Sequence, residues 1–207
     1  MATSNWLSWA RKIQAIAPSG WHYTTNPIDN ERYAELTSLA PEITAAQTGA
    51  GVDDVKAVFA EQEGYATPRL DIRGVVFKDD KVLLVRELMD GGRWTLPGGW
   101  VDVDEPPSLA VEREVREEAG LLVRATKLLA VYDRNLHGHP AYYFHIYKLF
   151  FLCELIGEAI ADPLETADPT YFAQDDLPEL SVGRVTVEEI KRFFEHHRNP
   201  DLPTDFD

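Results

Sequence analysis

The stretch "LPGGWVDVDEPPSLAVEREVREEAGLL", residues 96–122, gathers acidic side chains directly behind a Pro-Gly-Gly turn. A helix is predicted from Pro106 to Ala119, because proline suits the first turn and Gly120 suits the residue after the last. Three acids of this helix fall within an arc of roughly 100°: Glu114, Glu117 and Glu118. Carboxylates at this spacing repel one another on an exposed helix, so the cluster needs a compensating partner.

Two partners fit the acidic arc. Arg113 and Arg116 offer salt bridges, which would make the arc an ordinary solvated face. A hard divalent cation is the alternative, because magnesium prefers oxygen ligands and is commonly shared with substrate phosphates. The glycines Gly98 and Gly99 favour the cation, since they let a backbone carbonyl point at the same place. The stretch therefore predicts a metal-binding platform.

The spacing of this segment carries a family resemblance. From Gly99 the sequence runs through five residues to Glu105, then seven to "REV" at 113–115, one to "EE" at 117–118, and one to "GL" at 120–121. This pattern resembles the Nudix box at every defining position, which rejects the interpretation as a solvated face. The resemblance implies a hydrolase that splits nucleoside diphosphates linked to another group, X. It also implies an α/β/α sandwich around a mixed β-sheet.

Roles for the box residues follow from the resemblance. It implies that Mg²⁺ or Mn²⁺ is bound by the carboxylates of the acidic arc and by a backbone carbonyl: Glu114, Glu117, Glu118 and Gly98. The structural residues of the box would be Gly99, Glu105, Arg113 and Gly120, with Glu105 and Arg113 forming a bridge. Diphosphate hydrolysis needs a carboxylate to orient or deprotonate the attacking water. Glu118 is the first candidate, and Glu165, in an acid-rich loop, is the second unless it is an ordinary exposed acid.

Several flanking residues are candidates for substrate contacts. Arg69 and Arg73 lie close to the box in sequence, where a guanidinium grips phosphate well, unless one pairs with an acid such as Asp71. Trp94 or Trp100 could stack on a base, although packing in the core is an equal alternative. A predicted strand end and the loop after it hold four more candidates: Tyr132, Arg134, His137 and His139.

The whole-chain composition excludes several classes of protein. The formal net charge of −15 argues against a protein that grips long nucleic acids. The single cysteine, Cys153, excludes a disulfide framework and a zinc cluster and is typical of a reducing cytoplasm. No apolar run approaches the roughly 20 residues that span a bilayer.

Two domains are predicted, a helical domain at 1–63 and the Nudix domain at 64–207, which makes the chain α+β. The first helix should bury an apolar stripe of Trp6, Leu7, Ala10, Ile13 and Ile16, and Asp29 should cap the second. In the Nudix domain a β-hairpin is expected around Asp79 and Asp80, and a strand from Ala141. An acidic loop is expected at 161–180, followed by a helix at 186–196.

A second resemblance covers nearly the whole chain. The segments "NPIDNERYAEL", "GYATPRLDIRGVVF" and "DDLPELSVGR" are similar to a bacterial Nudix subgroup with a helical N-terminal domain. The subgroup includes CDP-choline pyrophosphatases and ADP-ribose-like hydrolases. It implies a small nucleotide substrate and a homodimer. Two alternatives stay open: hydrolysis of nucleoside triphosphates or RNA 5′ ends, and a nucleotide sensor without catalysis.

Overall fold

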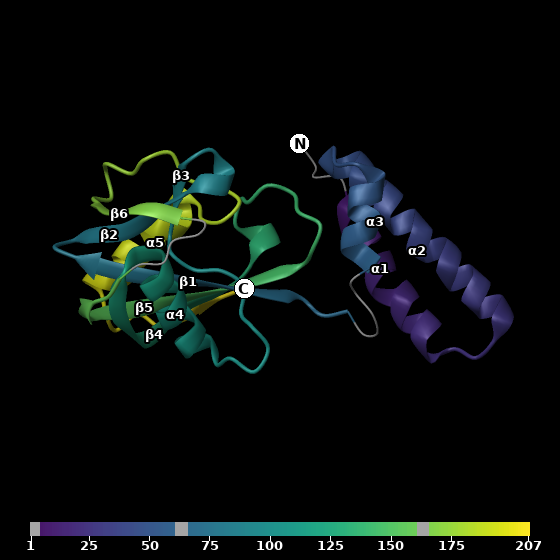
Figure 1. Cartoon of the computed structure of the whole chain (residues 1–207), viewed down its shortest axis with the longest axis horizontal. Coiled ribbons are helices and arrows are strands. Elements are labelled where there is room, and N and C mark those ends of the chain that lie inside the picture. The colour runs from purple at the N-terminus through teal and green to yellow at the C-terminus, as the bar shows by residue number, and fades with distance from the viewer. Residues whose placement is uncertain (1–4, 61–65, 161–165) are drawn as a thin grey trace. The chain divides into compact units, whose positions relative to one another are not determined.

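The computed structural model describes residues 5–60, 66–160 and 166–207, which form two compact units (Figure 1). The helical unit comprises Met1–Pro68 together with Ala141–His145. The sheet unit comprises Arg69–Pro140 and Ile146–Asp207. Among the helices in the described ranges, none is both long and apolar enough to cross a membrane.

The helical unit contains α1 (Trp6–Tyr23), α2 (Pro27–Thr48) and α3 (Val52–Ala60). The predicted cap at Asp29 is wrong, because the helix begins one turn earlier. Asn26 is the N-cap, and its side chain accepts a hydrogen bond of 3.0 Å from the Ile28 N–H. Proline directly after this cap is favourable, since its missing N–H would have no helical partner.

The buried face of α1 differs from the predicted apolar stripe. Ala10, Gln14 and Ala17 are buried, whereas Trp6 is 52% exposed and Ile16 is 63% exposed. The small alanines let the helix backbones approach closely, and the bulky side chains lie on the other side of α1. The prediction that the indoles pack inside this unit is therefore wrong.

The segment after Pro140 also departs from the prediction. A strand was expected from Ala141, but β5 begins only at Ile146. Residues 141–145 belong to the helical unit, where the Phe144 ring lies 6.3 Å from the Phe59 ring. Aromatic packing within that unit decides the conformation of this apolar segment.

The sheet unit is built on one mixed sheet. Its strands are β1 (Arg69–Lys78), β2 (Lys81–Glu87), β3 (Arg93–Thr95), β4 (Leu121–Asp133), β5 (Ile146–Glu158), β6 (Thr166–Phe172) and β7 (Asp205–Phe206). Their order is β3-β2-β1-β5-β4-β7, with β6 also paired to β2. The β1–β5 and β4–β7 pairs are parallel and the others antiparallel, which confirms the mixed sheet expected from the sequence.

The predicted hairpin is present between β1 and β2. Phe77 pairs with Val82 across it, and the turn residues Asp79 and Asp80 have φ values of 50° and 52°. Two central residues with positive φ match the twist of the flanking strands, and aspartate tolerates this conformation better than most residues.

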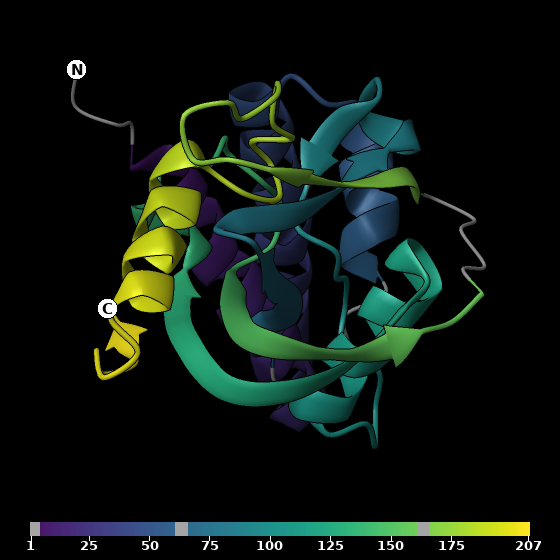
Figure 2. The ribbon, with the colours of Figure 1, turned by 90° about the vertical axis from the view of Figure 1, so that its left-hand side faces the viewer.

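Alternating side chains divide the sheet between two cores. On β2, Val82 and Leu84 face a core completed by α5 (Val187–Arg198), while Leu83 and Val85 face a core completed by α4 (Pro107–Ala119). The two helices therefore cover opposite faces of the sheet (Figure 2). This arrangement confirms the α/β/α sandwich.

Part of the segment expected to be an acidic loop is a strand. β6 lies antiparallel to β2, with Phe172 opposite Val82, and the register shifts between Leu84 and Arg86. Pro169 lies in β6, which is tolerated because an edge strand leaves one side of its backbone without a ladder. Pairing with a distant strand outweighs the local turn signals of the segment.

A buried charged cluster lies where β1 meets β5. Asp71 accepts two hydrogen bonds from Arg73, of 3.1 and 2.7 Å, and a third from Lys148, and all three residues are buried. Burial alone would raise the pKa of Asp71, but the charges and hydrogen bonds of Arg73 and Lys148 outweigh it and lower this pKa to about 2. Burial lowers the pKa of Lys148. The cluster is stable only as a whole.

Replacing Asp71 with Asn should lower the free energy of unfolding by about 3–5 kcal/mol, because two buried cations lose their counter-charge. Urea denaturation measures this change. Asp80→Asn is the matched control, since Asp80 also pairs with an arginine, Arg198, but both side chains are half exposed. Its effect should stay below about 0.5 kcal/mol.

The same comparison should depend on pH. Since the folded pKa of Asp71 is depressed, its ionisation stabilises the protein fully above the unfolded value of 3.8 and no longer does so below about 2. The gap between the wild-type protein and Asp71→Asn should therefore narrow by about 2 kcal/mol over this window. A difference in unfolding free energy that did not change with pH would contradict the proposed stabilisation by the Asp71 carboxylate. So would equal losses of stability in Asp71→Asn and Asp80→Asn.

Candidate active site

The Pro-Gly-Gly loop lies directly on β1. The Gly74 N–H donates to the Pro97 carbonyl (2.8 Å), the Ile72 N–H donates to the Gly99 carbonyl (2.9 Å), and the Val101 N–H donates to a β1 carbonyl. The loop is thus fixed residue by residue against the sheet. The carbonyl of Gly98 lies between the two that pair with β1.

Gly98 is required by a close backbone contact, and Gly99 lies close to the acidic helix. Gly98 has a φ of 141°, and a Cβ there would lie 2.1 Å from the Ile72 carbonyl oxygen. At Gly99 a Cβ would lie 3.1 Å from Oε1 of Glu114. Only glycine lets the backbone lie between β1 and the acidic helix.

The helix α4 presents its acids toward this loop. It begins after Pro106 and ends at Gly120, which has a φ of 65°. Its apolar face is buried against the sheet through Ala110, Val111, Val115 and Ala119. Because that face is fixed by the core, the arc with Glu114, Glu117 and Glu118 is fixed as well.

Arg113 connects the loop to the acidic arc. Its guanidinium donates two hydrogen bonds of 2.9 Å to Glu105, which is the bridge expected from the sequence. Its Nη1 also donates to Glu114 (2.9 Å) and to Glu117 (3.0 Å). One arginine therefore both closes the loop and balances two of the three acids.

Glu118 lies differently from its neighbours. One of its carboxylate oxygens accepts a hydrogen bond of 2.9 Å from the Gly98 N–H. Burial raises the pKa of Glu118 to about 7, although the charge of Arg73 opposes this shift. Burial also raises the pKa of Glu114. In both cases burial, which disfavours the charged carboxylate, outweighs the nearby arginines.

These residues fit a divalent cation by their chemistry. The acidic arc and the Gly98 carbonyl offer only oxygen donors, which Mg²⁺ and Mn²⁺ accept. A cation beside these carboxylates would favour their charged forms. In the described ranges, however, no three acidic, histidine or cysteine side chains are positioned to hold an ion. The reason is Arg113, since Glu114 and Glu117 would have to turn away from it to bind an ion.

Arg73 does not reach outward to a phosphate as the sequence allowed. Its Nε and Nη2 donate to Asp71, and its Nη1 donates to the Leu96 carbonyl (3.2 Å). The alternative, in which this arginine pairs with Asp71, is the one that the structure contains. Arg73 therefore binds the start of the glycine loop through the Leu96 carbonyl and places a positive charge beside Glu118.

The candidates after β4 also make internal contacts. Tyr132 is buried and stacks on the His137 ring at 3.7 Å, and His137 pairs with Asp207. Buried Arg134 donates to the Pro140 carbonyl (2.7 Å) and also to the Gly183 carbonyl. The ring of His139 lies between the Val182 carbonyl (2.7 Å) and Glu189 (3.0 Å). These contacts hold the 134–140 loop, and the substrate-binding roles of these residues stay predictions.

The aromatic and remaining candidates separate by burial. Trp94 packs in the core, with its ring 4.8 Å from the Phe172 ring, so the packing alternative holds for it. Trp100 is exposed, and Arg69 begins β1. Glu165, the second candidate for the base, lies outside the described residues.

One pair near the site escaped the sequence analysis. Glu87, at the end of β2, is buried, and its Oε2 lies 3.0 Å from Nε of Arg184. The negative charge of Glu87 also acts to raise the pKa of Glu118, so the pair lies beside the acidic arc. The two residues are almost a hundred positions apart, and no local pattern connects them.

Comparison with known proteins agrees with this geometry. Residues 67–197 match the NUDIX domain model, and residues 4–59 match a model described as a UDP-X-like, N-terminal oligomerisation domain. The chain belongs to the Nudix family. It is a Nudix hydrolase by family and carries this second, N-terminal domain, and relatives that match its whole length bear the names of a pyrophosphatase and a diphosphatase.

Particular relatives narrow the comparison. The chain is 36% identical over 204 residues to a Bacillus subtilis (strain 168) protein named "Putative ADP-ribose pyrophosphatase YjhB", covering 99% of this chain and 98% of that one. A crystal structure of a UDP-X diphosphatase is 32% identical, with full coverage of both chains and a TM-score of 0.63. An ADP-ribose pyrophosphatase from Streptococcus suis 89-1591 is 40% identical, covers 68% of this chain and 100% of its own, and has a TM-score of 0.62.

Gly98→Ala should lower the free energy of unfolding by about 3 kcal/mol or more, because the new Cβ meets the Ile72 carbonyl in a strained backbone conformation. Urea denaturation measures the effect. Gly91→Ala is the control, since Gly91 also has a positive φ, of 65°, but a Cβ added there would meet no atom within 4 Å. It should lose only about 1–2 kcal/mol. Equal losses in the two variants would show that the loop is not packed tightly on β1.

Proposed function

We propose that this protein hydrolyses the diphosphate bond of a nucleoside diphosphate linked to X, of the CDP-choline or ADP-ribose type. The reaction needs a divalent cation, Mg²⁺ or Mn²⁺. The products are a nucleoside monophosphate and X-phosphate. The observation that carries the proposal is the partly buried Glu118 carboxylate, which the Gly98 N–H holds at the end of the acidic arc.

The substrate class is supported by the relatives. Two of them bear the name ADP-ribose pyrophosphatase, and a third is a UDP-X diphosphatase. All three names describe a nucleoside diphosphate joined to a further group. The match of residues 4–59 to a UDP-X-like domain favours the same class over nucleoside triphosphates or RNA 5′ ends.

The chain's own residues supply the positioning chemistry. Divalent ions, when bound by the acidic arc, stabilise the charge that develops on the phosphate oxygens. Glu118 takes a proton from the water that attacks phosphorus, and its raised pKa suits this task near neutral pH. The Gly98 N–H fixes the orientation of this carboxylate, and the Glu105–Arg113 bridge holds the loop that carries Gly98.

A sensor that binds nucleotides without hydrolysing them is the other candidate. Such a protein has no need of a carboxylate tuned for proton transfer. The complete acidic arc, with one member whose pKa is raised to about 7, favours hydrolysis.

Glu118→Gln should reduce kcat by at least about 100-fold while the protein stays folded, because the amide keeps the shape but cannot accept the proton. The assay incubates purified protein with Mg²⁺ and a panel of CDP-choline, ADP-ribose, UDP-sugars, triphosphates and 5′-triphosphate RNA, and products are identified by mass. Glu112→Gln is the matched control on the same helix. Glu112 only accepts a hydrogen bond from the Ala125 N–H (2.8 Å), which an amide oxygen also does, so activity should be unchanged.

Release of a nucleoside monophosphate from a diphosphate-linked substrate supports the proposal. Preferred hydrolysis of a triphosphate would overturn the substrate class. Tight binding without turnover under either metal would leave the sensor.

The protein acts, we propose, as a homodimer formed through α1. Five large apolar side chains of α1 recur at heptad-like spacing along one face of the helix: Trp6, Trp9, Ile13, Ile16 and Tyr23. Within a single chain this face is largely exposed, with Tyr23 at 72%. An exposed apolar stripe of this kind marks a protein interface, and the family model for this region describes an oligomerisation domain.

Ile16→Glu should convert the dimer to a monomer, because a carboxylate in an apolar helix interface loses its hydration. Sedimentation velocity measures the change in mass. Ile160→Glu is the control, since Ile160 is also exposed but lies in the sheet unit. A monomeric wild-type protein, or a dimer that survives Ile16→Glu, would refute the interface.

The cytoplasmic location is likewise a proposal, supported by the single buried cysteine.

A further inference from the structure

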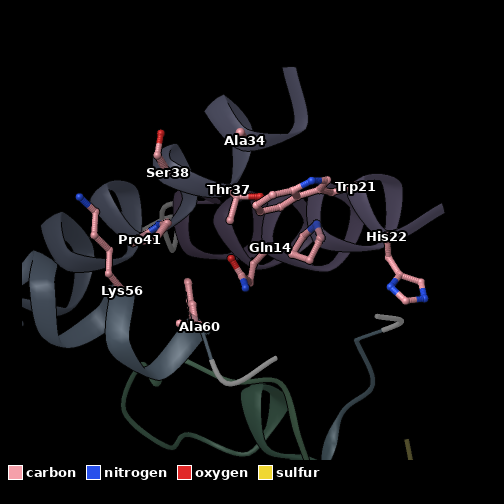
Figure 3. Close-up of a pocket in the computed structure, with 11 residues that line it drawn as sticks. Gln14, Trp21, His22, Ala34, Thr37, Ser38, Pro41, Lys56 and Ala60 are labelled. Atoms are coloured by element: carbon pink, nitrogen blue, oxygen red, sulfur yellow. The ribbon is translucent and has the colours of Figure 1, made fainter. Parts of the chain in front are cut away.

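The helical unit contains a pocket that the hydrolase chemistry does not use. It has a volume of about 680 Å³, which lies within the usual range for small-molecule sites. One face of each helix lines it, at helical spacing: Gln14, Pro18 and Trp21 on α1, Thr37 and Pro41 on α2, and Phe59 on α3. Figure 3 shows the Gln14 amide and the Trp21 ring on this lining.

Gln14 is the unusual member of the lining. The residue is only 4% exposed, yet among the described residues neither its Oε1 nor its Nε2 has a hydrogen-bond partner. A buried amide without partners is costly, and such groups are rare in native proteins. The amide presents a donor and an acceptor side by side, so the missing partner should carry an acceptor beside a donor.

The two prolines leave two backbone carbonyls of lining residues without their usual helical donors. Pro18 has no N–H, so the Gln14 carbonyl lacks its usual α-helical donor four residues on. Pro41 affects the Thr37 carbonyl in the same way. Both freed carbonyls belong to residues that line the pocket. A ligand with more than one N–H on the same edge would therefore fit best.

The remaining walls suit a flat ring. Trp21 is half exposed, which leaves its indole surface available for stacking. Pro18, Pro41 and Phe59 are apolar. Lys56 and His22 lie on opposite sides of Gln14 (Figure 3). The ring, and not a phosphate, is thus the part that the pocket would recognise.

We propose that this pocket binds a nucleobase carrying an exocyclic amine beside a ring nitrogen acceptor, as adenine and cytosine do. The amine donates one N–H to Gln14 Oε1 and the other to a freed carbonyl, and the ring nitrogen accepts from Gln14 Nε2. A glutamine amide pairs with adenine through two such bonds elsewhere in proteins. The indole of Trp21 stacks on the ring.

The test uses nucleosides, which carry no phosphate, and the full-length protein in EDTA. Adenosine and cytidine are the probes, and inosine and uridine, which lack the amine, are the matched ligands. Binding is measured by isothermal titration and by saturation-transfer NMR. Because neither metal nor diphosphate is present, the result is independent of the proposed hydrolase activity. Adenosine or cytidine should bind, and inosine and uridine should bind at least about tenfold more weakly.

Three variants locate the bound base. Gln14→Leu should weaken binding at least about tenfold and raise Tm, because it removes a buried amide without partners. Trp21→Ala should also weaken binding. Gln47→Leu, at an exposed position of α2, should leave it unchanged.

Two results would overturn the proposal. One is that neither adenosine nor cytidine binds at millimolar concentration. If Gln14→Leu then shifts the monomer–dimer equilibrium, the pocket is filled by a second copy of the chain. The other is binding that Gln14→Leu does not weaken. Loss of hydrolysis with nucleoside binding retained would contradict the proposed function and leave this site intact.

Discussion

The site depends on the seating of the Pro-Gly-Gly loop on β1. Alternate backbone groups of the loop pair with Ile72 and Gly74, so the strand dictates the position of each loop residue. A side chain at Gly98 would collide with the strand, which means that no other residue permits this contact. The Gly98 N–H then fixes Glu118, and the geometry of the acidic arc follows from the sheet.

Charge is distributed unevenly around this loop. On the β1 side of the loop lies a cluster of one acid and two cations, formed by Asp71, Arg73 and Lys148. Arg73 also donates a hydrogen bond to the Leu96 carbonyl. On the α4 side of the loop, Arg113 pairs with Glu114 and Glu117, Arg116 also pairs with Glu117, and burial raises the pKa of Glu118. The net positive charge of this cluster partly balances the net negative charge of the acidic arc on the other side of the loop. The arc can therefore still accept added positive charge.

The helical unit has two features that are unfavourable for a single chain in water. The buried face of α1 uses small alanines, while several of its large apolar side chains, Trp6, Trp9 and Ile16 among them, are exposed in the single chain. Its pocket contains a buried amide without a partner among the described residues. Exposed apolar area and unpaired buried amides are both unfavourable in water, so both features indicate that the unit acts with a partner or a ligand.

Local patterns in the sequence were sufficient for the box helix, for the hairpin at Asp79–Asp80 and for the mixed sandwich, because spacing and turn chemistry act over a few residues. The Glu105–Arg113 bridge was implied by the resemblance to the Nudix box, and the structure contains it. Tertiary structure decided the rest. Arg73, Arg134 and His139 find their partners through contacts across the fold, as do β6 and the Glu87–Arg184 pair. A charged side chain looks the same in sequence whether it meets substrate or a buried neighbour, and only packing distinguishes the two.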